Sequence, residues 1–140
     1  MPNEPILIVD DNPMNLKLEK RLLETEQYQV LTAKSAEETL EILEYFRPRL
    51  ILMDFQLPGM DGVDLTKKLR ENPKNKEIPI LMLTSHDQRG DEAKAIAAGC
   101  NGYIAKPIDT QLLPKVIASY VRGGHGMDQT GHPMNKLYFF

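Results

Sequence analysis

Residues 51–62 read ILMDFQLPGMDG, an apolar run that reaches Asp54 and is followed closely by turn-forming residues. The apolar positions do not alternate with polar ones, which is typical of a strand covered on both faces in a parallel sheet. Pro58, Gly59 and Gly62 predict a sharp turn soon after that strand. The stretch therefore predicts a rigid, buried strand with a carboxylate at its carboxyl end, beside a loop that leaves this end uncovered.

The chain on either side of this stretch repeats a short apolar run followed by a longer amphipathic segment. We predict strands over residues 6–9, 28–33, 50–53, 78–83 and 102–105. Helices are expected over 13–26, 35–47, 61–72 and 90–98, with a fifth after Asp109. This alternation predicts an α/β fold in which helices cover both faces of a five-stranded parallel sheet.

The helix starts carry capping signals, namely Asn12 with Pro13, Ser35 with Glu38, Asp61, and Asp109. In the first helix, Met14, Leu18 and Leu22 recur every four residues and predict the apolar stripe. Pro114 lies inside the last predicted helix, where it removes a backbone donor. We therefore expect that helix either to begin after Asp109 or to bend at the proline.

Composition bounds the class of protein. The chain has 140 residues, 41% hydrophobic and 26% charged, which suits one domain with a single core. Its net charge of -3 argues against direct binding of nucleic acid. A lone cysteine and an N-terminus without signal-peptide or membrane-span character favour a cytoplasmic location. We expect a domain over residues 1–122 and a flexible, glycine-rich tail over 123–140.

Polar side chains stand at the carboxyl ends of the predicted strands. Asp10 and Asp11 follow the first strand, Asp54 ends the third, and Thr84 and Lys106 end the fourth and fifth. These ends meet at one edge of a parallel sheet, where ligands usually bind. Clustered carboxylates without nearby histidine or thiolate ligands favour Mg²⁺. The edge thus predicts a Mg²⁺ site that also binds a phosphoryl group.

Within that site each residue type predicts a role. A carboxylate oxygen of Asp54, fixed at the end of a buried strand, is placed to attack phosphorus. Lys106 offers a positive charge and Thr84 a hydrogen-bond donor to the phosphoryl oxygens. The main-chain carbonyl near Gln56 is free to bind the metal.

The pattern DD…DFQLPGMDG…TS…KP resembles the receiver domain of two-component response regulators, over residues 5–121. The motif spacing is similar to that of the chemotaxis response regulator. The resemblance implies a flavodoxin-like, doubly wound (βα)5 fold with strand order 2-1-3-4-5. It also implies that Asp54 is the phosphoacceptor, that Asp11 is a direct Mg²⁺ ligand, and that Asp10 is a second acidic member acting through water. The Gln56 main-chain oxygen would complete the metal ligands, and the Lys106–Pro107 peptide would be cis.

The resemblance further implies a signalling role. A histidine kinase or histidine phosphotransfer protein would donate the phosphoryl group, docking on the first helix near Met14 and Leu18. Thr84 and Tyr103 would form the switch that changes the binding face for a downstream protein. Gln56 and His86 would modulate the hydrolysis rate of the phosphorylated form. Such a stand-alone receiver is not an enzyme beyond its own phosphorylation and dephosphorylation, and self-pairing as a homodimer stays open.

Other functions remain as alternatives. A receiver-like module could bind proteins without being phosphorylated. A phosphatase of the haloacid-dehalogenase type also uses a strand-end aspartate and Mg²⁺, but it needs a second aspartate where this chain has Gln56. A P-loop or dinucleotide protein needs a glycine-rich loop after the first strand, and here Asp-Asp-Asn-Pro follows instead.

Overall fold

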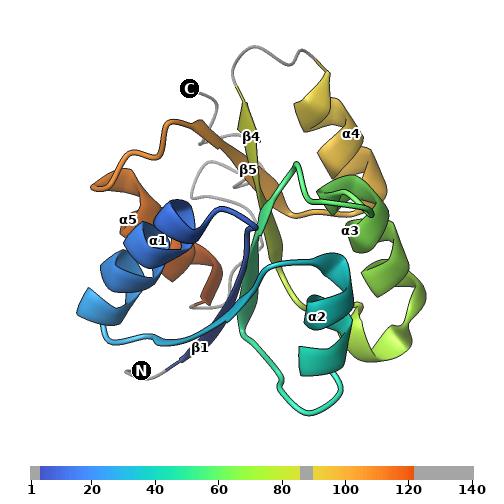
Figure 1. Cartoon of the computed structure of the whole chain (residues 1–140), viewed down its shortest axis with the longest axis horizontal. Coiled ribbons are helices and arrows are strands. Elements are labelled where there is room, and N and C mark those ends of the chain that lie inside the picture. The colour runs from blue at the N-terminus through green and yellow to red at the C-terminus, as the bar shows by residue number, and fades with distance from the viewer. Residues whose placement is uncertain (1–3, 86–89, 122–140) are drawn as a thin grey trace.

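The sheet that positions the site has five parallel strands in the order β2-β1-β3-β4-β5 (Figure 1). The computed structural model describes residues 4–85 and 90–121. The strands are β1 (Pro5–Val9), β2 (Gln29–Ala33), β3 (Leu50–Asp54), β4 (Ile80–Ser85) and β5 (Gly102–Lys106). The expected doubly wound fold and strand order are confirmed.

The helices begin where the capping residues predict. They are α1 (Pro13–Thr25), α2 (Ala36–Ile42), α3 (Gly62–Glu71), α4 (Asp91–Ala98) and α5 (Leu112–Val121), with a short 3-10 helix η1 (Pro73–Asn75). The side chains of Asn12, Ser35 and Asp61 accept hydrogen bonds from the first turns of α1, α2 and α3. Asp109 accepts from the N–H of Leu112, so α5 begins after it. Pro114 then falls in the first turn, where an N–H has no helical acceptor.

Helices cover both faces of the sheet and divide the core in two. Helices α1 and α5 lie on one face, and α2, α3 and α4 lie on the other (Figure 1). Because side chains alternate along a strand, Ile8, Leu52 and Ile104 face α1 and α5. Their neighbours Val9 and Met53 face the other three helices. Both layers are buried, which explains why the central strands are apolar without alternation.

Several details differ from the prediction. The strand expected over 78–83 is β4, Ile80–Ser85. Met14 and Leu18 are exposed, with 81% and 43% of their surface accessible, and the buried side of α1 instead carries Leu16, Glu19 and Leu23. The apolar spacing was right for a helix, but of its three residues only Leu22 packs against the core. Helix α2 ends at Ile42 instead of continuing to 47. After it the N–H of Glu44 bonds to the carbonyl three residues back, and the chain turns toward β3. The helix η1 was not predicted.

Some expectations concern residues outside the described part of the chain. These are the predicted tail over 123–140 and the role of His86. Within residues 4–85 and 90–121, none of the helices has the length and apolar character needed to span a bilayer.

Candidate functional site

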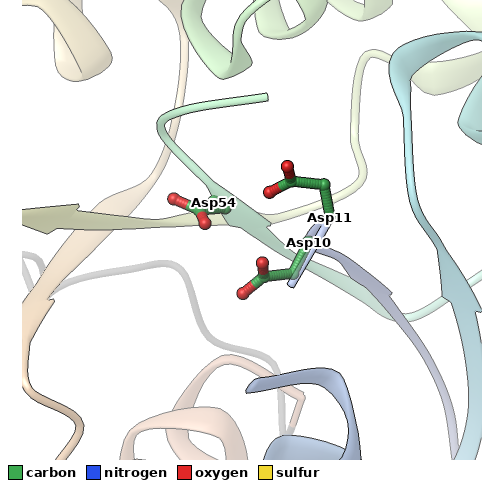
Figure 2. Close-up of side chains that lie close together, drawn as sticks. All are labelled: Asp10, Asp11 and Asp54. Atoms are coloured by element: carbon green, nitrogen blue, oxygen red, sulfur yellow. The ribbon is translucent and has the colours of Figure 1, made fainter. Parts of the chain in front are cut away.

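Three carboxylates meet at the carboxyl edge of the sheet. Asp54 is the last residue of β3, and Asp10 and Asp11 directly follow β1. One oxygen from each lies within 4.8 Å of the others. Figure 2 shows the three side chains close together at the strand ends. The N–H of Asp10 bonds to the carbonyl of Ala33 at 3.0 Å, which extends the β1–β2 ladder and fixes this residue. Asp10 and Asp54 are buried and Asp11 is exposed, so the cluster opens to solvent on the Asp11 side.

Lys106 supplies the positive charge of the cluster. Its Nζ donates to Oδ2 of Asp54 at 2.9 Å, from the end of β5. The other oxygen of Asp54 accepts from the N–H of Gln56 at 3.1 Å. Both oxygens of Asp54 are therefore held in place, and one of the three carboxylates has a charge partner. The Lys106–Pro107 peptide bond is cis, as expected.

Two buried oxygens at this edge have no hydrogen-bond partner, and they test whether a cation and a phosphoryl group fit. Asp10 uses Oδ1 to accept from the N–H of Asn12 at 2.9 Å, but its Oδ2 is unpartnered. The hydroxyl of Thr84 is also buried without a partner. Such groups are unfavourable unless a ligand satisfies them. The free carboxylate oxygen suits a hard divalent cation, and the free hydroxyl suits an oxyanion.

The electrostatics of Asp10 agree with this interpretation. The pKa of Asp10 is raised to about 6, chiefly by burial and also by the Asp54 carboxylate. The N–H of Asn12 and the charge of Lys106 act in the opposite direction. An added cation would act in the same direction as Lys106 and favour the ionised carboxylate. The residues present therefore fit Mg²⁺.

A family model for the response regulator receiver domain matches residues 6–118, which include all the clustered side chains. The chain belongs to the response regulator receiver family. Receiver domains are signalling domains, and the strand order and site found here agree with membership.

Known receivers are similar over most of this chain. The polar-differentiation response regulator DivK of Brucella anthropi is 36% identical over 116 residues, which are 83% of this chain and 94% of DivK. The receiver domain of the sensor histidine kinase PA1611 from Pseudomonas aeruginosa was solved with magnesium in its active-site cleft. It is 30% identical, with a TM-score of 0.80, and the match covers 86% of this chain and 99% of that one. The Saccharomyces cerevisiae Ssk1 receiver domain, solved with the histidine phosphotransfer protein Ypd1, is 29% identical with a TM-score of 0.79. That match covers 86% of this chain and 90% of the other.

The remaining predicted site residues lie at different depths in this receiver. Thr84 is buried one residue before the end of β4, and Tyr103 is buried on β5. In the parallel register Thr84 pairs with Ala105, so the side chains of Thr84 and Tyr103 lie on the same face of the sheet. Gln56 is exposed and contacts the cluster through its backbone. The roles expected for these residues came from the family resemblance and stay predictions.

In the loop after Asp54, Gly62 has a packing role that the sequence analysis did not predict. A Cβ on Gly62 would lie 2.5 Å from the carbonyl oxygen of Asp54 and 2.9 Å from Sδ of Met82. The N–H of Gly62 also donates to the carbonyl of Phe55 at 2.9 Å. This glycine therefore lets the start of α3 pack tightly against the end of β3. Gly59 allows the turn itself, with φ of 76°.

One residue close to the site was missed by the sequence reasoning. Glu19 is fully buried in α1, and the charges of Asp10, Lys106 and Asp54 all act on its carboxyl group. The signal was present in the sequence, because Leu16, Glu19 and Leu23 lie on one side of a helix. It was missed because the spacing of Met14 and Leu18 indicated a different apolar side of the helix.

Proposed function

We propose that this chain is a response regulator that accepts a phosphoryl group on Asp54 from a phosphohistidine donor, in a Mg²⁺-dependent reaction. The observation that carries the proposal is the cluster of three carboxylates. One of them, Asp10, has a buried oxygen without a hydrogen-bond partner, and another, Asp54, accepts a hydrogen bond from Lys106 at 2.9 Å. Membership of the receiver family and the magnesium found in the PA1611 receiver support it.

In this reaction Asp54 is the nucleophile. One carboxylate oxygen forms the new bond to phosphorus while the bond from phosphorus to the donor imidazole breaks, and the electron pair returns to the ring nitrogen. The bond from the Gln56 N–H and the ion pair with Lys106 orient the carboxylate before the donor arrives. Lys106 and the free hydroxyl of Thr84 would then bind the phosphoryl oxygens.

Asp10, Asp11, Asp54 and the main-chain carbonyl of Gln56 would hold the cation. When bound, Mg²⁺ supplies positive charge that offsets the repulsion between the incoming phosphoryl group and the carboxylates. Asp10 and Asp11 approach the cluster from the end of β1, and Asp54 from the end of β3. Asp10 and Asp54 are buried and Asp11 is exposed, so a cation would enter the site from solvent on the Asp11 side.

The donor would be a histidine kinase or a histidine phosphotransfer protein that docks on α1. Met14 and Leu18 are exposed on this helix, and Asn12, which caps it, is two residues from Asp10. Exposed apolar residues beside a reactive site favour a protein partner. The complex of the Ssk1 receiver with Ypd1 shows a relative bound to such a protein.

The output would be a change in protein binding on the side of α4 and β5. Thr84 and Tyr103 lie on one face of the sheet, in the layer covered by α4. Movement of Thr84 toward a phosphoryl oxygen would alter the packing around Tyr103, and phosphorylation would thus favour one arrangement of this surface. The side chain of Gln56, together with His86, would modulate how long the phosphoryl group lasts.

The test is phosphorylation by acetyl phosphate with Mg²⁺, followed by intact-protein mass spectrometry. We expect a mass gain of one phosphoryl group in the wild type and in D64N, which removes an exposed carboxylate of α3. No gain is expected for D54N or when the metal is removed with EDTA. An unlabelled wild type would favour a receiver-like module that works without phosphorylation, and steady turnover of a simple phosphomonoester would favour a phosphatase.

A further inference from the structure

The buried carboxyl group of Glu19 has no role in the function proposed above. None of its surface is exposed, and neither side-chain oxygen has a hydrogen-bond partner among the described residues. It lies between Leu16 and Leu23 on the inner side of α1, where an apolar residue would be more favourable. A group that is unfavourable for folding invites a functional explanation.

Glu19 lies on the same side of the sheet as the polar strand ends. Asp10, Asp54 and Lys106 follow Ile8, Leu52 and Ile104 by two residues each, so strand alternation places their side chains on the face covered by α1 and α5. Figure 1 shows both helices on that face. Glu19 is buried on α1 with Leu16 and Leu23, which belong to this layer, so it lies on the same side of the sheet as these three strand-end side chains.

The site and Glu19 are coupled through their charges. The pKa of Glu19 is raised to about 8, chiefly by burial and also by the charges of Asp10 and Asp54, while the charge of Lys106 opposes the rise. Interactions between charged groups are reciprocal, so the charge of Glu19 must act on whatever occupies the cluster. A divalent cation there would attract this carboxylate, and it would do so in a medium from which water is excluded.

We propose that Glu19 is an accessory carboxylate of the divalent-cation site, a residue that is not a ligand but whose buried carboxyl group, once it is ionised, strengthens Mg²⁺ binding. The proposal rests on the Mg²⁺ site of the proposed function. The proposal predicts opposite effects on Mg²⁺ affinity and on stability. If Glu19 serves cation binding and not folding, removing it should weaken Mg²⁺ binding and stabilise the folded protein. A residue with a purely structural role would leave the Mg²⁺ affinity unchanged.

The experiment compares E19Q, which keeps the shape, and E19L, which removes the polar group, with the wild type. E24Q is the matched control, since Glu24 is an exposed carboxylate of the same helix. Mg²⁺ dissociation constants are measured by isothermal titration calorimetry at pH 8, and stability without metal by urea denaturation. We expect Kd to rise about fivefold or more in both Glu19 variants, a typical coupling between interacting sites. Kd for E24Q should stay close to that of the wild type, and both Glu19 variants should unfold at higher urea concentration.

The outcomes separate the two proposals. If the wild type binds Mg²⁺ and the Glu19 variants bind it equally well, the accessory role is wrong and the proposed function stands. If the variants are less stable than the wild type or do not fold, Glu19 is a structural residue and the accessory role is again wrong. If the wild type itself binds no Mg²⁺, the cation site fails, and with it both proposals.

Discussion

Replacing Glu19 with leucine should stabilise the protein by an amount that depends on pH. The pKa of this carboxyl group is about 8 in the folded chain, against an ordinary value of 4.5. Between these two values the unfolded chain releases a proton that the folded chain retains, so the stability of the wild type falls as pH rises and levels off above the folded pKa. With about 1.4 kcal/mol for each pKa unit, Glu19 lowers the free energy of unfolding by about 2 kcal/mol between pH 6 and pH 8. The leucine variant has no carboxyl group at this position, so its unfolding free energy does not fall for this reason.

The assay is urea denaturation in EDTA, followed by far-ultraviolet circular dichroism at pH 6 and pH 8. The gap in unfolding free energy between E19L and the wild type should widen by about 2 kcal/mol from the lower to the higher pH. Groups that do not interact with Glu19 contribute equally in both proteins, so their contributions cancel in this difference. E24Q, with its exposed carboxylate removed, should show no such widening. A gap of equal size at both pH values would refute the argument that burial keeps Glu19 protonated.

Three further predictions follow from contacts around the site. G62A should lower the unfolding free energy by about 1–3 kcal/mol, because the new methyl group would lie 2.5 Å from the carbonyl oxygen of Asp54. A thermal melt tests this, and an unchanged melting temperature would contradict the close packing. K106M should lower the Kd for Mg²⁺ in a calorimetric titration, because it removes the cation that is paired with Asp54. Weaker Mg²⁺ binding in K106M would mean that the lysine organises the site more than it competes for it. R70K should lower the urea midpoint by an amount equivalent to about 2 kcal/mol. Arg70 donates hydrogen bonds to Gly99, to Asn101 and to two carbonyls near η1, and the single ammonium of a lysine cannot reach all of these acceptors. A midpoint equal to that of the wild type would show that this network adds little stability.

The fold and the carboxylate cluster could be predicted because both follow from short-range rules. Unalternating apolar runs identified the central strands, and the residues at their ends had to meet at one edge, as Asp10 and Asp54 do. The inner side of α1 was predicted wrongly, because Met14 and Leu18 have the spacing of a core stripe but lie outside. Spacing gives the period of a helix and not which side faces the sheet. The role of Gly62 also needed coordinates, since it depends on a carbonyl oxygen eight residues earlier that packs against it.

The unsatisfied polar groups of this receiver are concentrated at the end where ligands would bind. Among the described residues, the buried side-chain atoms without a hydrogen-bond partner are one oxygen of Asp10, the hydroxyl of Thr84 and both oxygens of Glu19. Elsewhere in that part of the chain the buried polar groups are paired, as the hydroxyl of Thr66 is with the carbonyl of Gly62 at 2.8 Å. Each unpaired group leaves free energy that a suitable ligand can recover. A cation would recover part of it at Asp10 and Glu19, and a phosphoryl oxygen would recover the part at Thr84. Thr84 lies on the same face of the sheet as Tyr103, so the proposed movement of Thr84 toward a phosphoryl oxygen would alter the packing under α4 and thereby favour one arrangement of that surface.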